Sequence, residues 1–186
     1  MRKEKNLESK MHICTYQSAL GNILLAADEI GLTGLWFEGQ KYFANTLPKE
    51  RVEKETAILT ETKKWLDVYF CGKEPKFTPP LHPVGSPFRQ EVWKILLQIP
   101  YGQTTTYGEI ARQLAEKKEV PHMSAQAVGG AVGHNEVSII IPCHRVVGTS
   151  GSLTGYAGGI DKKVALLELE GTDMSSFFIP QKGTAL

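Results

Sequence analysis

Residues 73–88, KEPKFTPPLHPVGSPF, contain five prolines and separate two stretches of different pattern. Proline lacks a backbone N–H and has a fixed φ, so this segment cannot form a helix and is a poor central strand. It therefore predicts an extended connector. A chain of 186 residues is long enough for one compact domain or two small ones. We expect an N-terminal domain over 1–80 with a disordered start, a linker at 81–86, a C-terminal domain over 87–175 and a tail at 176–186.

The N-terminal part alternates short β-rich segments with turn residues. Residues 11–39 contain the triplets LGN and EIG, where Gly and Asn favour hairpin turns, so we expect a small antiparallel sheet. Residues 59–70, LTETKKWLDVYF, have the spacing of an amphipathic helix that opens with a turn from Thr60 to Lys63 and ends at Gly72. The apolar stripe of this helix consists of Trp65, Val68 and Tyr69. The pattern predicts an α/β fold.

The C-terminal part begins with three predicted helices. Apolar residues recur at three- and four-residue spacing up to the helix breakers at 100–102, and they are Phe88, Val92, Ile95, Leu96 and Ile99. Thr106 can cap a second helix, and Ser124 can cap a third, SAQAVGGAVGHN. Three short helices close together predict a helix-turn-helix.

The end of the chain combines a strand, a loop and a helix. The run VSIII predicts a strand over 137–141, and the glycine-rich stretch GTSGSLTGYAGG predicts a loop. A last helix is expected over 161–169, with Asp161 as its N-cap and Gly171 as its stop.

The bulk composition is that of an ordinary globular protein. The net charge is +1, and acidic residues equal basic ones in number between Arg89 and Glu170, so charge gives no support for nucleic-acid binding. Cysteines at 14, 71 and 143, without a CxxC motif, indicate reduced thiols. The start lacks the apolar core of a signal peptide, and no run reaches the roughly 18 apolar residues of a membrane span. We expect a cytosolic protein.

One cluster of reactive residues follows the predicted strand. In IPCHRV, Cys143 would act as a thiolate, whose pKa of ~8.5 must fall toward neutrality through a cation, a helix N-terminus or a base. His144 points to the opposite face if the segment is extended, so it would need a bridging water to take the proton. Glu170 is the carboxylate that we assign to orient the ring, because an acid in a last helical turn opposes the helix dipole.

The joint pattern resembles a known family. IPCHRV, preceded by AVGGAVGHN and followed by GYAGG, together with FRQEVWKILLQIPYGQTTTYGEIA, closely resembles the O6-alkylguanine-DNA alkyltransferases. The resemblance is dense from about 86 to 171 and loose over the first 80 residues. It implies a ribonuclease H-like N-terminal domain and a winged helix-turn-helix C-terminal domain. It also implies a suicide DNA-repair protein without metal or cofactor, whose sulfur takes the alkyl group from a guanine flipped out of the duplex.

The resemblance implies a role for each matching residue. Cys143 would be the nucleophile, His144 the water-linked base and Glu170 its orienting acid, while Asn135 would brace the loop beside the cysteine and Tyr107 would assist the leaving base. The third helix would enter the minor groove of double-stranded DNA. The implied substrate and DNA contacts are Gln126, Ala127, Gly130, Val146, Thr149, Tyr156, Ala157, Lys163 and Arg89. Val146 and Ala157 would read the guanine edge through their backbone carbonyl and amide, respectively. We expect the protein to act as a monomer.

Three positions depart from the family pattern. Gln126 replaces the arginine that many relatives use to fill the place of the extruded base, and it lacks that planar cation. Glu136 stands where the family usually has proline, and Ser138 stands where some relatives have proline. The size of the pocket therefore does not transfer from the resemblance.

Other interpretations compete with this one. Cys143 taken alone fits a buried structural thiol, and Arg145 better fits a role in holding a loop than a phosphate contact. A lesion-binding protein without catalysis and a cysteine hydrolase are the alternative functions. Some relatives bind zinc in the N-terminal domain, but we expect no metal here because the spacing of possible ligands is weak; these are His12, Cys14, Cys71 and His82.

Overall fold

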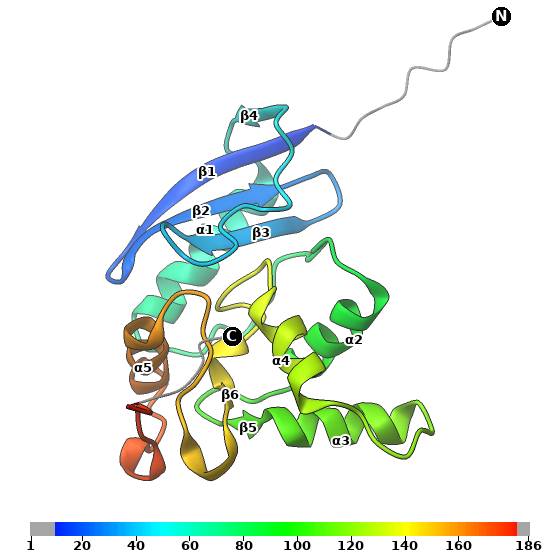
Figure 1. Cartoon of the computed structure of the whole chain (residues 1–186). Coiled ribbons are helices and arrows are strands. Elements are labelled where there is room, and N and C mark those ends of the chain that lie inside the picture. The colour runs from blue at the N-terminus through cyan, green and yellow to red at the C-terminus, as the bar shows by residue number, and fades with distance from the viewer. Residues whose placement is uncertain (1–9, 182–186) are drawn as a thin grey trace, which may run out of the picture.

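A four-stranded sheet forms the N-terminal part of the computed structural model, which describes residues 10–181 (Figure 1). The strands are β1 (Met11–Ser18), β2 (Gly21–Ala27), β3 (Leu32–Phe37) and β4 (Arg51–Glu53), in the order β3-β2-β1-β4. The first three strands pair antiparallel, as predicted, whereas β4 pairs parallel to β1 and was not predicted. Gly21 has a φ of 109° in the first hairpin, a conformation that favours glycine.

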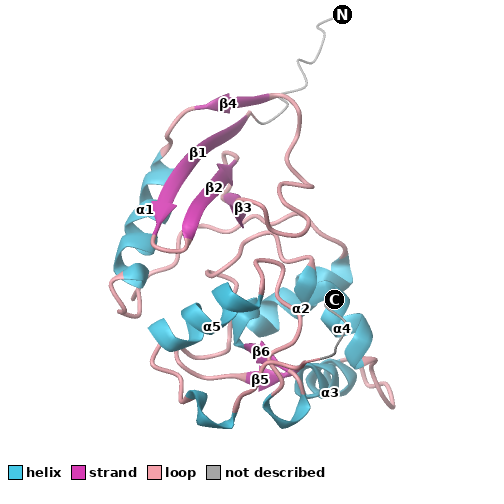
Figure 2. Cartoon of the chain, turned by 60° about the vertical axis from the view of Figure 1, so that its left-hand side comes forward, coloured by secondary structure: helices cyan, strands magenta, loops and turns pink. Residues whose placement is uncertain are grey.

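Helix α1 (Ala57–Phe70) packs against the sheet (Figure 2). It begins earlier than the predicted turn at Thr60, because the hydroxyl of Thr56 accepts a hydrogen bond from the N–H of Leu59 at 3.4 Å. Val68 is only partly buried, so the predicted apolar stripe is wrong at this residue. The buried residues of α1 are Leu59, Thr62, Trp65, Leu66 and Tyr69.

The proline-rich connector is extended, as expected, and runs along the free edge of β3. The N–H of Leu32 donates to the carbonyl of Pro80 at 2.7 Å, and the N–H of His82 donates to the carbonyl of Leu32 at 2.8 Å. Helix α2 (Pro87–Leu96) then begins at the cap Ser86. It ends before Ile99, because the last bonds change to the tighter pattern in which Ile99 N–H donates to Leu96.

Two further helices form the predicted helix-turn-helix. Thr106 caps α3 (Tyr107–Lys117) and Ser124 caps α4 (Ala125–Gly133), both as predicted. Helix α4 packs against both α2 and α3. The short strand β5 (Thr105–Thr106) pairs parallel with β6 (Val146–Val147), which links the start of α3 to the segment that follows the cysteine.

The predicted strand over 137–141 is wrong. Val137 makes a single bridge to Leu35 of β3, and the chain then turns, with Ile139 at a φ of 69°. The β-branched side chains are buried in this turn, but the backbone forms no strand ladder. The apolar run therefore indicated burial and not strand pairing. The turn leads into the 3₁₀ helix η1 (Cys143–Arg145).

The last segments hold one misassigned cap. Helix α5 (Ile160–Leu169) begins at Gly159 without a side-chain cap, and Asp161 lies in its first turn rather than at the N-cap. Gly171, at a φ of 73°, ends the helix as expected. Two 3₁₀ helices complete the fold, η2 (Thr149–Gly151) and η3 (Met174–Ser176).

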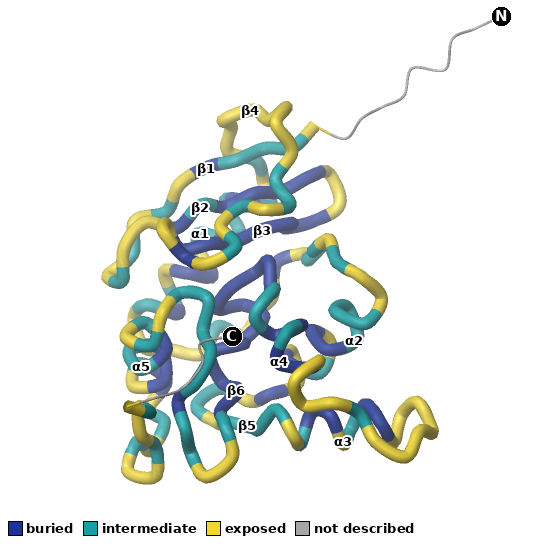
Figure 3. Tube along the Cα trace, viewed as in Figure 1, coloured by how far each residue is buried: buried dark blue, intermediate teal, exposed yellow. Residues whose placement is uncertain are grey.

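Both halves of the chain share one hydrophobic core. Figure 3 shows β3 and the segment before β6 as buried, and their side chains belong to one cluster. That cluster includes Leu35, Phe37, Trp65, Trp93, Ile110, Val132 and Val137. Most of the predicted disordered start, residues 1–9, and residues 182–186 of the predicted tail lie outside the described residues. Between residues 10 and 181, no helix is both long and apolar enough to cross a bilayer.

Candidate active site

Cys143 begins η1 and is braced by Asn135. The Asn135 side-chain amide donates to the Cys143 sulfur at 3.1 Å and to the carbonyl of Ile141 at 2.7 Å, while its oxygen accepts from the N–H of Val137 at 3.0 Å. Asn135 therefore fixes both ends of the buried turn and presents a donor to the sulfur. Only 4% of Cys143 is exposed.

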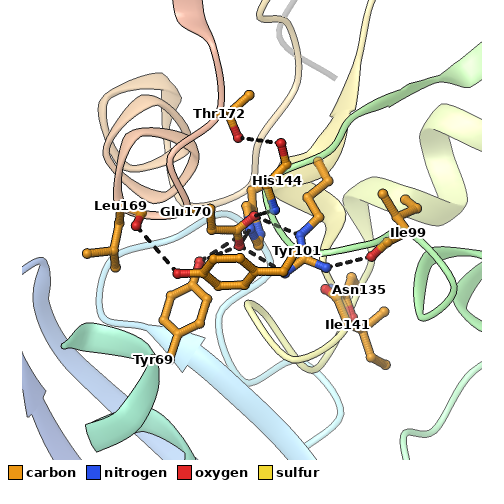
Figure 4. A network of polar contacts seen from close by, with 11 residues as sticks. Tyr69, Ile99, Tyr101, Asn135, Ile141, His144, Leu169, Glu170 and Thr172 are labelled. Atoms are coloured by element: carbon orange, nitrogen blue, oxygen red, sulfur yellow. Dashed lines mark hydrogen bonds and ion pairs between the residues drawn. The ribbon is translucent and has the colours of Figure 1, made fainter. Parts of the chain in front are cut away.

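The segment Cys143–Arg145 is a 3₁₀ turn, so the expected extended geometry is wrong. Consecutive side chains of a 3₁₀ helix point about 120° apart, rather than to opposite faces. Cys143 can therefore face Asn135 while His144 and Arg145 both turn toward the end of α5. There, Nε2 of His144 lies 2.6 Å from Oε1 of Glu170 (Figure 4).

Glu170 is the centre of a buried polar network. Arg145 donates to both carboxylate oxygens, at 2.9 and 3.0 Å, and the N–H of Gly102 donates at 3.1 Å. Tyr69 donates its hydroxyl proton to the same carboxylate at 2.7 Å. Burial opposes ionisation, but hydrogen bonds from His144 and Arg145 and the charge of Arg145 outweigh it and lower the pKa of Glu170 to about 2. Glu170 is therefore a carboxylate at neutral pH.

The ionised carboxylate fixes the proton on His144. A carboxylate can only accept hydrogen bonds, so Nε2 of His144 must carry the proton and donate it to Glu170. Burial lowers the pKa of His144, which keeps the ring neutral. Nδ1 then holds the free lone pair, and among the described residues this buried atom has no hydrogen-bond partner. The imidazole is thus oriented with one unused basic nitrogen.

The thiol is protonated in this environment. Burial raises the pKa of Cys143, and the Asn135 hydrogen bond and the Lys163 charge only partly oppose this effect. The expectation that the thiol pKa falls toward neutrality is therefore wrong for the protein alone. A neutral thiol and a neutral imidazole occupy the site together, and an ion pair forms only when a proton leaves the sulfur.

Lys163 and Tyr107 hold the backbone on the other side of the cysteine. The buried ammonium of Lys163 donates to the carbonyls of Val146 at 2.6 Å and Thr154 at 2.8 Å, and burial lowers its pKa to about 8. The hydroxyl of Tyr107 donates to the carbonyls of Thr154 and Gly155, both at 3.2 Å. Burial raises the pKa of Tyr107, so its hydroxyl keeps its proton at neutral pH.

Tyr156 and Ala157 lie in the same glycine-rich loop. The Tyr156 ring centroid lies 6.5 Å from that of His144, and its buried hydroxyl has no hydrogen-bond partner within residues 10–181. The carbonyl of Ala157 accepts from the N–H of Lys41 at 2.9 Å. The loop is therefore tied to the N-terminal sheet region as well as to the cysteine segment.

The other predicted contact residues lie on the outer surface of the C-terminal part. Gln126 and Ala127 are exposed in the first turn of α4, and a Cβ added to Gly130 would meet no atom within 4 Å. Thr149 is exposed and Arg89 is half-buried on α2. Among the described residues, none of the side chains of Gln126, Thr149 and Arg89 hydrogen-bonds to the network of Glu170.

Two family models match the chain. The model described as 6-O-methylguanine DNA methyltransferase, DNA binding domain, matches residues 87–172, and the model described as its ribonuclease-like domain matches residues 11–83. The chain belongs to this methyltransferase family. The predicted ribonuclease-like and helix-turn-helix fold class is thereby confirmed.

Named relatives agree with this family. The methylated-DNA--protein-cysteine methyltransferase of Methanosarcina acetivorans is 43% identical over 163 residues, which are 87% of this chain and 99% of the relative. The crystal structure of Mycobacterium tuberculosis OGT in complex with DNA has a TM-score of 0.73 at 42% identity, over 86% of this chain and 92% of that chain. An O6-methylguanine DNA methyltransferase from Methanococcus jannaschii has a TM-score of 0.60 at 29% identity, over 91% and 100%.

The sequence interpretation of this methyltransferase-family chain missed two contributors to the network. Tyr69 was assigned only to an apolar stripe, although a buried tyrosine hydroxyl needs a hydrogen-bond partner. Gly102 was read as a helix breaker, yet its φ is 74° and a Cβ there would lie 2.9 Å from the carbonyl oxygen of Glu170. The structural role favoured for Arg145 agrees with its contacts, which also include the carbonyl of Ile99 at 2.6 Å.

The suggested zinc ligands lie in different environments. Cys14 is buried and Cys71 is exposed, while His82 pairs with Asp28 at 2.6 Å. In the part of the chain that the structure describes, no three His, Cys, Asp or Glu side chains are grouped to hold a metal ion.

Proposed function

We propose that this chain repairs DNA by moving an alkyl group from O6 of guanine to the sulfur of Cys143, once per molecule. The observation that carries the proposal is the pairing of a braced thiol with an oriented imidazole. Asn135 donates to the sulfur at 3.1 Å, and His144 is held by Glu170 at 2.6 Å, in a chain of the 6-O-methylguanine DNA methyltransferase family.

The reaction needs the side chains of this site and one bridging water. A sulfur–carbon bond forms as the carbon–O6 bond breaks, and the electron pair of the broken bond goes to guanine. The thiol proton passes through a bridging water to Nδ1 of His144, whose imidazolium is stabilised by the Glu170 carboxylate. The imidazolium then gives its proton through water to the guanine, so His144 returns to its neutral form and the products are a thioether and neutral guanine. No metal or cofactor takes part.

Burial suits a nucleophile that is used once. Because burial raises the pKa of Cys143, the resting thiol is protected from adventitious oxidation and alkylation. The thiolate forms only when the imidazole takes the proton, with the Asn135 amide and the Lys163 ammonium stabilising the new charge. These two groups therefore offset the free-energy cost of a buried thiolate when a substrate is bound.

We propose that the base is read by the backbone around the cysteine. Val146 offers its carbonyl and Ala157 its amide to the guanine edge, Tyr156 forms a wall of the pocket, and Tyr107 donates its hydroxyl proton to the leaving base. Burial raises the pKa of Tyr107, so the hydroxyl keeps its proton and can donate a hydrogen bond to the leaving base. Lys163 supports the pocket by holding the carbonyls of Val146 and Thr154.

We also propose that α4 enters the minor groove of double-stranded DNA and that the damaged base is flipped out. The small, exposed face of Ala127 and Gly130 allows a close approach of backbone to DNA, and Gln126 fills the space that the base leaves. Arg89 and Thr149 are assigned to flanking contacts. One chain supplies every residue of this site, which supports action as a monomer, and three free thiols support a cytoplasmic location.

Stoichiometric labelling tests the proposal. The protein is mixed with duplex DNA that carries radiolabelled O6-methylguanine, and the expected result is one acid-stable label per chain on the peptide containing Cys143. Cys143→Ala is expected to bind the same duplex and take no label, because the remaining pocket is intact. Release of the label with repeated turnover would identify a hydrolase instead. Labelling of Cys143→Ala would overturn the nucleophile assignment.

A further inference from the structure

The segment Gln40–Thr46, called the strap here, joins the N-terminal sheet to three parts of the candidate site. It begins three residues after the end of β3 and contains two residues in the left-handed region, Tyr42 at a φ of 60° and Ala44 at 53°. Residues other than glycine rarely adopt this conformation, so surrounding contacts must hold the strap in this shape. Those contacts are made with the C-terminal half of the molecule.

The first contact is with the end of α4. The rings of Tyr42 and His134 stack with their centroids 4.0 Å apart and their planes at 22°. His134 is the C-cap of α4, and its Nδ1 lies 2.7 Å from the carbonyl of Gly130. Tyr42 therefore packs on the residue that terminates the helix we propose to enter the DNA groove.

The second contact is with the pocket loop, defined as residues 155–159. The N–H of Lys41 donates to the carbonyl of Ala157 at 2.9 Å. This bond fixes the peptide group that follows Ala157, one residue from the proposed amide contact to guanine. The strap thus contacts the C-terminal end of α4 and the pocket loop through two adjacent residues, Tyr42 and Lys41.

The third contact explains two departures from the family pattern. Thr46 and the indole of Trp36 both donate to one carboxylate oxygen of Glu136, at 3.1 and 2.9 Å. Ser138 donates its hydroxyl proton to the side-chain oxygen of Gln40 at 3.4 Å. Glu136 and Ser138 are therefore occupied by the strap and its neighbour Trp36. Both residues lie in the turn that follows Asn135, the residue that braces the cysteine.

We infer that the strap is a positioning element that keeps the pocket loop in register with α4. The inference rests on the proposed function. Because Cys143 is only 4% exposed, a flipped base must be received in a confined site while α4 stays in the groove. Helix and loop are distant in sequence, and the strap contacts both. It should therefore matter most for a substrate that occupies the groove and the pocket at once.

Tyr42→Asn separates this role from general stability. Asparagine tolerates the left-handed conformation of Tyr42 but removes the stacked ring. Single-turnover transfer is measured from O6-methylguanine in a duplex and in the single strand of the same sequence, which needs no groove insertion. The ratio of duplex to single-strand rates is expected to fall about five- to tenfold, as expected from the loss of one aromatic stack. Phe43→Asn is the matched control, because this neighbouring exposed ring has no aromatic partner within the described residues.

Hydrogen exchange gives a second readout. The Lys41 amide is expected to exchange faster in Tyr42→Asn and at the normal rate in Phe43→Asn, because the bond to Ala157 depends on the shape of the strap. An unchanged rate ratio for Tyr42→Asn overturns the inference, and so does an equal fall of both rates, which would indicate a merely structural role. If the unaltered chain takes no label from either substrate, the proposed function fails and the inference fails with it.

Discussion

At the scale of single residues, the thiol of Cys143 and the imidazole of His144 are neutral. The Glu170 carboxylate, paired with Arg145, orients the imidazole. The guanidinium of Arg145 balances the negative charge of the Glu170 carboxylate, which also accepts a hydrogen bond from His144. Burial is the main cause of the lowered pKa that keeps His144 neutral although it touches an acid, and the charge of Arg145 adds to this effect. A base must be neutral to accept a proton, so the arrangement favours the proposed role.

Tyr69→Phe tests this balance. The Tyr69 hydroxyl donates to the carboxylate at 2.7 Å, and its removal leaves more negative charge for His144. The pKa of His144 should therefore rise, and the transfer rate should begin to decline at a higher pH as the solution is acidified. The measurement is the single-turnover rate as a function of pH, with the free energy of unfolding expected to fall by about 1 kcal/mol.

Tyr101→Phe is the matched control for Tyr69→Phe. The Tyr101 hydroxyl donates to the backbone carbonyl of Leu169 at 3.4 Å, next to the carboxylate but not on it. Its loss should leave the pH profile of transfer in place. An unshifted profile for Tyr69→Phe, or an equal shift for Tyr101→Phe, would contradict the assigned balance.

The sequence singled out residues that the structure brings together around Cys143 and Glu170, but it did not indicate their protonation. The motif around Cys143 and the acid at Glu170 were identified because their residue types suit the chemistry. The partners of Glu170 lie far along the chain, and Tyr69 is 101 positions away. The direction of the Cys143 pKa depends on how completely the fold buries it, and no local pattern reports that quantity.

At the scale of elements, capping residues predicted the starts of α3 and α4, whereas the apolar run over 137–141 predicted a strand that does not form. Thr106 and Ser124 were predicted as caps and accept the expected N–H bonds. The run over 137–141 was misread because β-branched residues favour any buried extended or turned backbone. Its hydrogen bonds go to β3 and to its own turn, which depends on tertiary contacts.

Ser124→Ala tests the role of α4 as an element. The Ser124 hydroxyl accepts from the N–H of Ala127 at 3.3 Å, so its loss should lower the free energy of unfolding by about 1 kcal/mol. The first turn of α4 carries Gln126 and Ala127, and fraying there should also weaken duplex binding severalfold. Thr56→Ala removes the cap of α1 and should cost similar stability without changing DNA affinity. Equal affinity for all three proteins would contradict a DNA contact by α4.

At the scale of the whole molecule, the N-terminal and C-terminal parts contact each other through residues of the candidate site and its neighbours. The proline-rich stretch is extended, yet β3 pairs with the segment at Glu136 and Ser138, and α1 supplies Tyr69 to the carboxylate network. The proline-rich stretch lies between α1 and α2. It carried no information on how closely the halves pack, because a connector pattern does not specify an interface.

The same burial that orients the site makes the stability of the whole molecule depend on pH. The folded chain lowers the pKa of His144 from its ordinary 6.5, chiefly by burial, so below pH 6.5 the unfolded chain binds more protons and acid favours unfolding. A second loss follows below pH 4.5, where unfolded Glu170 takes a proton while the folded carboxyl resists until about 2. We expect urea unfolding free energies to fall through both windows. His144→Gln, which keeps an amide donor for Glu170, should lack the first fall, whereas the exposed control His122→Gln should retain it. A first fall that persists in His144→Gln would mean that another group is its source.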